Sequence, residues 1–130
     1  MGGHLCDLSL PPEALKTAAR WIAWRSELPG TAVTLGVVGD QVFAEVRGRR
    51  TDLMINSGYP PGTPEKTIGL TRGALWAAAQ WCMGPPDAAD VDLLVDDRML
   101  LVYQGDEWAG FDTDGSPASE EYLAVAPLDR

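Results

Sequence analysis

The segment Leu8-Ser-Leu-Pro-Pro-Glu-Ala-Leu-Lys-Thr-Ala-Ala-Arg-Trp-Ile22 has a counterpart 60 positions further along the chain, Ile68-Gly-Leu-Thr-Arg-Gly-Ala-Leu-Trp-Ala-Ala-Ala-Gln-Trp-Cys82. Six of the fifteen aligned positions are identical, namely Leu10/Leu70, Ala14/Ala74, Leu15/Leu75, Ala18/Ala78, Ala19/Ala79 and Trp21/Trp81. With a gap of three residues, Gln41–Gly48 also aligns with Arg98–Gly105, and both segments follow an acidic turn and end at glycine. An internal repeat of this kind indicates that one supersecondary unit occurs twice.

The first copy is predicted to contain a strand, a helix and three further strands. Cys6, Leu8 and Leu10 alternate with polar residues, as in a half-buried strand. Pro12 suits the first turn of a helix over Pro12–Arg25, whose inward stripe is Leu15, Ala18, Ala19 and Ile22. The turns Gly39-Asp40 and Gly48-Arg49-Arg50 then separate strands at Ala32–Val38, Gln41–Arg47 and Thr51–Asn56.

The same order is predicted after a connector rich in proline and glycine, residues 57–65. A short strand, Lys66–Leu70, precedes a helix over Arg72–Met83, for which Thr71 is the expected N-cap. Three more strands follow, at Val91–Val95, Arg98–Gln104 and Glu107–Asp112. The tail contains one apolar run, Tyr122–Ala126, which can add an edge strand or dock on a sheet.

Length and composition favour a single domain. The chain has 130 residues, of which 45% are hydrophobic and 22% charged, and a chain of this size buries roughly two-thirds of its unfolded surface. We therefore expect one α+β domain over residues 1–130, with βαβββ halves at 5–56 and 66–112, the connector 57–65 and a tail at 113–130. The two helices should lie side by side on one face of antiparallel sheets, related by a pseudo-twofold axis.

Two βαβββ units joined by a loop resemble one domain of a DNA sliding clamp, the processivity factor of DNA polymerases. The resemblance covers residues 5–112 and is closest to the bacterial polymerase beta subunit. It is carried by an opening such as Leu15-Lys-Thr-Ala-Ala-Arg-Trp-Ile22 and by strands such as Thr34–Phe43 and Leu93–Val102. A bacterial clamp chain has three such domains and a ring has six, so the resemblance implies that a ring of this chain needs six copies or further subunits.

In clamps, helices present Lys and Arg to DNA phosphates without reading bases, as in binding dominated by the nucleic-acid backbone. The resemblance therefore implies four DNA-facing candidates, Lys16, Arg20, Arg25 and Arg72. Trp76 and Gln80 stand at the positions that match Lys16 and Arg20 in the second copy. The alternative interpretation is that these cations are ordinary solvated residues of a helix.

Five tryptophans fall into two groups. Trp21 and Trp81 occupy equivalent places in the repeat and are expected to flank the core. Trp24, Trp76 and Trp108 are candidates for a partner surface, because tryptophan is enriched at binding hot spots. For the helical pair, packing of the helix against the tail is the competing explanation.

Catalytic and metal-binding patterns are weak, so we expect a protein that is not an enzyme and needs no cofactor. His4 is the single histidine, which leaves no basis for a Ser-His-Asp or Cys-His arrangement. Cys6 and Cys82 lie on apolar patterns typical of packing residues. Asp112-Thr-Asp-Gly115 lacks the remaining ligands of a calcium loop and is better interpreted as an acidic turn.

The formal net charge of −9 is unevenly distributed. Residues 1–58 hold six Lys/Arg and six Asp/Glu, whereas residues 59–130 hold four and thirteen. This excludes a general nucleic-acid-coating surface but leaves a local basic face open. Besides a clamp-like domain in replication, repair or regulation, an acidic immunity protein or antitoxin that blocks a basic toxin site is therefore the alternative.

Partners and location follow from the same considerations. Strands predicted at sheet edges, Thr51–Asn56 and Glu107–Asp112, carry few blunting charges, while Met54 and Trp108 offer apolar contact. We therefore expect self-association or a protein partner through these edges, with duplex DNA as a possible ligand of the helix face. The sequence has no long apolar run and no basic, apolar leader, so a cytoplasmic protein without membrane contact is expected.

Overall fold

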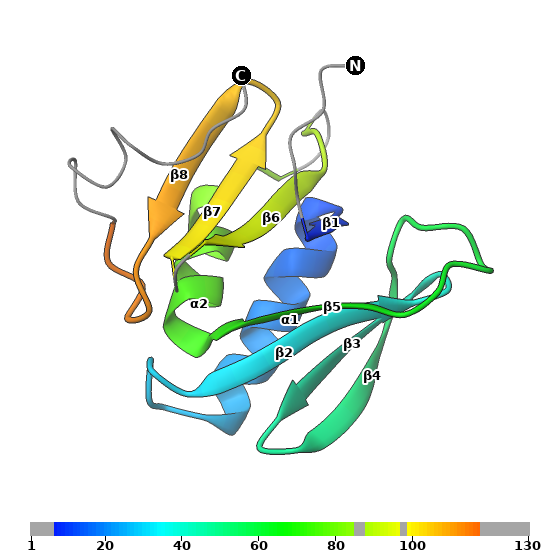
Figure 1. Ribbon diagram of the computed structural model, residues 1–130, viewed down its shortest axis with the longest axis horizontal. Coiled ribbons are helices and arrows are strands. Elements are labelled where there is room, and N and C mark those ends of the chain that lie inside the picture. The colour runs from blue at the N-terminus through cyan, green and yellow to red at the C-terminus, as the bar shows by residue number, and fades with distance from the viewer. Residues whose placement is uncertain (1–6, 85–87, 97–98, 118–130) are drawn as a thin grey trace.

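The computed structural model describes residues 7–84, 88–96 and 99–117, and shows an α+β fold with two helices and two antiparallel four-stranded sheets. The first five elements are β1 (Leu8–Leu10), α1 (Pro12–Arg25), β2 (Ala32–Val38), β3 (Gln41–Val46) and β4 (Arg49–Asn56). The remaining five are β5 (Lys66–Thr71), α2 (Arg72–Trp81), β6 (Val91–Asp96), β7 (Met99–Gln104) and β8 (Glu107–Phe111). Figure 1 shows the two sheets in front of the helices.

Each sheet takes three consecutive strands from one side of the connector at 57–65 and a fourth strand from the other side. The strand orders are β4-β3-β2-β5 and β1-β6-β7-β8, so β1 pairs with β6 and β5 pairs with β2. Leu8 lies opposite Leu93 and Leu35 opposite Ile68 in these two pairings. The connector at 57–65 therefore does not separate two self-contained halves, because each sheet is completed by a strand from beyond it.

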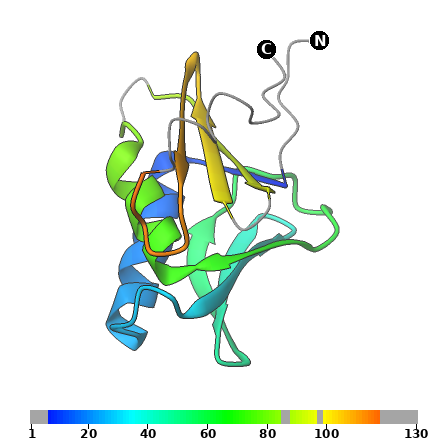
Figure 2. The ribbon, with the colours of Figure 1, turned by 60° about the vertical axis from the view of Figure 1, so that its left-hand side comes forward.

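The two helices pack against each other on one side of both sheets, as Figure 2 shows in profile. The prediction that they lie side by side is confirmed. They run antiparallel, because Lys16 near the start of α1 contacts the end of α2, and Arg72 at the start of α2 contacts Ser26 just after α1. Their small buried faces, with Ala18 and Ala78 fully inaccessible, let them approach closely over the inner faces of the sheets.

Local signals predicted both helix starts. The helix α1 has the predicted bounds Pro12–Arg25, with Pro at its first turn. Thr71 caps α2, because its Oγ1 accepts a hydrogen bond from the Ala74 amide at 3.2 Å. The prediction that α2 continues to Met83 was wrong, since extended backbone at Cys82 ends the helix after Trp81.

The strand β4 begins two residues earlier than predicted. Val46 pairs with Arg49, so the turn consists of Arg47 and Gly48, at φ 54° and 78°, rather than Gly48-Arg49-Arg50. Two successive positive φ angles are the signature of a tight hairpin turn whose twist matches that of the strands. β2 has the predicted bounds, β3, β5, β6 and β8 each differ from the prediction by one residue at one end, and Cys6 and Arg98 lie outside the described residues. Gln41 begins the second strand of its hairpin opposite Val38, and Met99 does so opposite Asp96. Gln41 therefore corresponds in position to Met99, one residue after the Arg98 with which the sequence repeat aligned it.

The predicted edge strands do lie at sheet edges, but both edges are modified. In β4 the pairing jumps from Phe43↔Asp52 to Gln41↔Asn56, which leaves a bulge in which Met54 has φ 59° and is 85% exposed. Bulges bend an edge strand and interrupt its free hydrogen-bonding groups. At the other edge, Pro117 forms an isolated bridge with Phe111 at the end of β8. Only part of each edge is therefore left regular within the described segments.

Candidate functional site

Lys16, the first DNA-facing candidate, is directed at α2. Its ammonium group donates to the carbonyl oxygen of Ala79 and, at 3.1 Å, to that of Cys82. These carbonyls belong to the last turn of α2 and to its C-cap residue, where helical hydrogen-bond partners run out and a positive charge is favourable. In this structure Lys16 therefore joins the two helices, a role that sequence spacing alone does not reveal.

The other three candidates have different surroundings. Arg72 donates its Nε–H to the Ser26 carbonyl at 3.1 Å, so it ties α2 to the residue after α1. Arg25 lies over the Trp21 ring, 4.1 Å from its centroid. Arg20 is exposed and donates to the Thr17 hydroxyl at 3.3 Å. Of the four, Arg20 and Arg25 have the surroundings expected of residues that meet a polyanion.

The tryptophans divide largely as the sequence indicates. Trp21 and Trp81 are partly buried and pack against the core, which confirms the prediction for this pair. Trp24 is 86% exposed on α1, and Trp76 is 36% exposed on α2, 5.8 Å from the Arg72 guanidinium. Trp108 is half-buried on β8, opposite Tyr103. Trp24 has the most exposed indole of these three and is the strongest partner-surface candidate, because tryptophan is enriched at binding hot spots.

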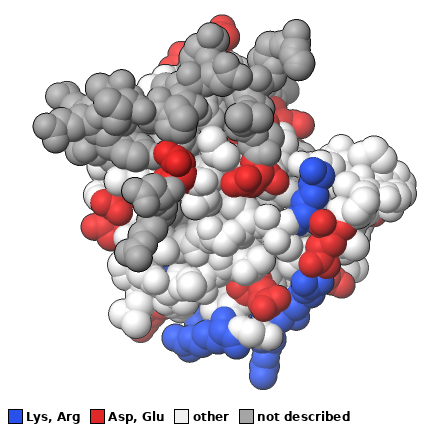
Figure 3. Space-filling view, in the orientation of Figure 1, with Lys and Arg blue, Asp and Glu red and all other residues white. Residues whose placement is uncertain are grey.

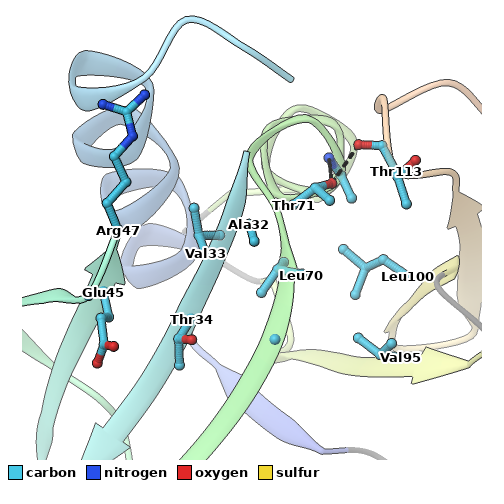
Figure 4. A pocket seen from close by; sticks show the side chains of 13 residues that line it. Ala32, Val33, Thr34, Glu45, Arg47, Leu70, Thr71, Val95, Leu100 and Thr113 are labelled. Carbon is cyan, nitrogen blue, oxygen red and sulfur yellow. Dashed lines mark hydrogen bonds between the residues drawn. The ribbon is translucent and has the colours of Figure 1, made fainter. Parts of the chain in front are cut away.

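A groove of about 600 Å³ opens where the two sheets diverge. Figure 4 shows Leu70, Val95 and Leu100 converging on it from β5, β6 and β7. One end is closed by the Thr71 hydroxyl, which donates to the Thr113 carbonyl, and the Glu45 and Arg47 side chains stand at the other end. A largely apolar lining with few polar groups suits an apolar side chain or a small organic ligand.

Cations gather along one edge of the sheet side of the molecule. Figure 3 shows Lys and Arg along the lower edge, where the β3–β4 hairpin lies in Figure 1. This hairpin supplies Arg47, Arg49 and Arg50, which the sequence analysis did not single out. Basic side chains are therefore found on the β3–β4 hairpin as well as on α1.

Arg50 is engaged in an ion-pair network on one side of the hairpin. Its guanidinium donates to both Glu65 carboxylate oxygens, at 3.0 and 3.2 Å, lies 3.7 Å from Glu45, and stacks 3.9 Å from the Phe43 ring centroid. The hydrogen bonds with Glu65 raise the pKa of Arg50 and lower the pKa of Glu65. Arg50 is thus compensated within the fold.

The cysteine and aspartate side chains that could act as a nucleophile or as metal ligands make structural contacts instead. Cys82 is buried in the core, as predicted, and burial raises the pKa of its thiol, which donates to the Ala79 carbonyl. Asp112 and Asp114 accept hydrogen bonds from Thr113 and Ser116 within a tight turn, and those from Ser116 lower the pKa of Asp114. Over residues 7–84, 88–96 and 99–117, no cluster of three His, Cys, Asp or Glu side chains could hold a metal ion.

Comparison with protein-family models, curated proteins and solved structures finds no match to the chain. Neither helix in the described part of the chain is long and apolar enough to cross a membrane.

Proposed function

We propose that the chain is a non-enzymatic, clamp-like domain made of two βαβββ repeats, which acts as a docking platform in DNA transactions. The observation that carries the proposal is the exchange of β1 and β5 between the two sheets. Each part of the chain supplies its first strand to the sheet of the other, and the two following helices pack side by side. The equivalent exchange in both directions is what a duplicated unit with twofold symmetry requires.

The helix surface supports contact with a polyanion or a protein. Arg20 and Arg25 lie exposed on α1 with Trp24, which combines charge for phosphate contact with a large apolar side chain. The groove between the sheets offers a second, apolar docking site. Location in the cytoplasm remains part of the proposal.

A sequence-blind affinity for duplex DNA tests the DNA-associated role. Replacing both Arg20 and Arg25 by glutamine is expected to weaken binding about equally for unrelated sequences and to reduce the slope of log affinity against log salt by roughly two, because each phosphate contact releases about one counterion. Fluorescence anisotropy of a labelled duplex across a salt series measures both quantities. Lys16 is left unchanged because it caps α2.

The matched control replaces Arg50 and Lys66 by glutamine, which removes the same charge from β4 and β5. Its salt slope should stay within the error of the wild type. Wild-type protein with no measurable affinity at low salt would retire the DNA-associated role and leave protein docking.

Self-association tests whether copies of the domain assemble into a ring, as the clamp resemblance implies. We expect at least a dimer at micromolar concentration, because β4 and β8 end their sheets and retain regular stretches for edge pairing. Sedimentation velocity with full-length chain and with a chain lacking residues 118–130 measures this, and the truncation spares the Phe111–Pro117 bridge. Association only after trimming would show that the tail covers an edge. If the full-length and the truncated chains are both monomeric at high concentration, ring assembly is contradicted.

The second candidate function is an acidic inhibitor of a basic partner. It is favoured by the excess of thirteen acidic over four basic residues in 59–130. An inhibitor would bind one basic protein with an affinity that falls with salt, and would show neither DNA affinity nor self-association.

A further inference from the structure

A second cavity lies on the helix side of the β3–β4 hairpin, at the end of α1. It measures about 420 Å³ and is lined by Trp21, Arg25, Val46, Arg47, Arg49 and Thr51. Half of the lining residues are arginines, and none is acidic. The volume falls in the range of pockets that hold small organic ligands, roughly 300–1,000 Å³.

Among the residues that the structure describes, no ion pair neutralises the three arginines of this pocket. The ion pairs found among the described residues join Arg50 to Glu45 and Glu65, and neither involves Arg25, Arg47 or Arg49. Like charges that share a concave site repel one another, and an anion that enters the site removes this repulsion. The pocket therefore favours a ligand with more than one negative charge.

The hairpin register determines which arginines face the pocket. Because the turn has two residues and Val46 pairs with Arg49, alternation puts Arg49 and Thr51 on the same face as buried Val46. Arg50 then lies on the opposite face with Glu45, as its ion pairs show. The turn predicted from the sequence, Gly48-Arg49-Arg50, would place both arginines outside the strand, where the alternation of faces does not apply.

Arg47 has a backbone conformation that disfavours its own side chain. Its φ is 54°, in the left-handed region that glycine and asparagine prefer. At the same position of two other hairpin turns the chain uses glycine, Gly39 at φ 57° and Gly105 at φ 61°. Arginine at this position is better explained by what its side chain does than by what its backbone needs.

We propose that this pocket binds the phosphate groups of a small phosphorylated ligand. Guanidinium groups match phosphate oxygens in paired hydrogen bonds. Three guanidinium groups can contact two linked phosphates, so a diphosphate should bind better than a single phosphate. The Arg25 guanidinium carbon lies over the Trp21 ring, a contact that restricts the position of the side chain, and the Thr51 hydroxyl supplies a further donor. Trp21 and Val46 form the apolar part of the lining, against which the organic part of the ligand packs.

Calorimetric titration with pyrophosphate, ADP, inorganic phosphate and adenosine tests the site. Pyrophosphate and ADP are expected to bind, inorganic phosphate more weakly, and adenosine not measurably. Tighter binding of ADP than of pyrophosphate identifies an organic phosphate as the ligand class, whereas equal affinity or a preference for pyrophosphate overturns it in favour of free phosphates.

Arg49→Gln should weaken pyrophosphate binding at least tenfold, because hydrogen bonds to charged groups are strong and this one is lost together with its charge. Arg50→Gln is the matched control on the next residue, and it should change the affinity less than twofold because Arg50 faces the other side. Equal losses in both variants, or a wild type that binds no pyrophosphate at low salt, would overturn the proposal.

Arg47→Asn separates binding from folding. An Asn-Gly turn suits the observed backbone better than Arg-Gly, so the variant should melt at a higher temperature than the wild type while binding pyrophosphate at least fivefold more weakly. Tight binding retained in this variant would contradict a role for Arg47. The DNA-binding test changes Arg25, which also lines the pocket, so the pocket is tested instead at Arg47 and Arg49, which that test leaves unchanged.

Discussion

Replacing Gly73 by alanine is expected to destabilise the domain by about 3 kcal/mol, as forced overpacking does. Alanine normally stabilises a helix relative to glycine, by about 1 kcal/mol in a helix interior, so the expected sign is the reverse of the usual one. The reason is the close approach of the turn after β8. A Cβ on Gly73 would lie 2.7 Å from the carbonyl carbon of Asp114, 2.8 Å from its oxygen and 3.0 Å from Pro29 Cβ.

Little room exists for relaxation at this contact. The Gly73 amide donates to the Pro29 carbonyl at 2.8 Å, which holds the start of α2 in position. On the other side, Gly115 has φ 90°, and a Cβ there would lie 2.6 Å from the Gly73 oxygen. The opposing atoms are backbone rather than flexible side-chain ends, so the strain must move either the helix or the turn.

Urea unfolding of the variant measures this effect, with Gly69→Ala as control. A Cβ on Gly69, in β5, meets no atom within 4 Å, and removing a glycine there should leave stability unchanged or raise it by about 0.5 kcal/mol. A Gly73→Ala protein as stable as the control would mean that the turn at 112–116 does not lie against α2.

Replacing Lys16 by methionine is expected to reduce the free energy of unfolding by about 2 kcal/mol, the effect of losing charge-assisted hydrogen bonds in a half-buried position. Methionine preserves most of the apolar stem, so packing is largely retained and the loss reports on the ammonium group. The carbonyls of Ala79 and Cys82 lose their donor, and the end of α2 loses a favourable charge.

The matched change is Arg20→Met, one turn further along α1, where the guanidinium is exposed and its contact with Thr17 is local. We expect this variant to be destabilised by less than about 0.5 kcal/mol, as for ordinary surface substitutions. If Lys16→Met were as mild as Arg20→Met but reduced DNA affinity, Lys16 would face the nucleic acid as the family resemblance implies. The two variants therefore decide between an interhelical role and a DNA-facing role for Lys16.

Helix starts and the positions of strands along the chain were predictable because they depend on short-range signals. Pro12 and Thr71 mark helix starts through backbone groups within a few residues, and alternation identifies strands in the same way. The pairing of β1 with β6 carries no such signal, since alternation shows that a strand has an apolar face but not which strand lies beside it. The repeat indicated that two like units exist, and left their interlocking open.

The candidate site was less predictable because long cationic side chains reach beyond their own element. Lys16 and Arg20 are one turn apart in sequence, yet one reaches a carbonyl of the neighbouring helix and the other stays in solvent. The arginine pocket was missed because Arg49 and Arg50 were assigned to the turn, whereas the turn is Arg47-Gly48 and β4 begins two residues earlier than predicted. The signal that could have found it was the Arg47-Gly48 dipeptide as a two-residue turn, which sorts Arg49 and Arg50 onto opposite faces.

The exchange of β1 has a consequence for how the protein is made. Ser9 and its partner Asp92 are separated by 83 residues, so at usual translation rates β1 leaves the ribosome on the order of ten seconds before β6. Its leucines, Leu8 and Leu10, are fully buried in the finished fold and have no sheet to join during that interval. The hairpins of β2, β3 and β4 can form meanwhile. Leu8 and Leu10 therefore stay without their strand partner in the nascent chain until β6 has been synthesised.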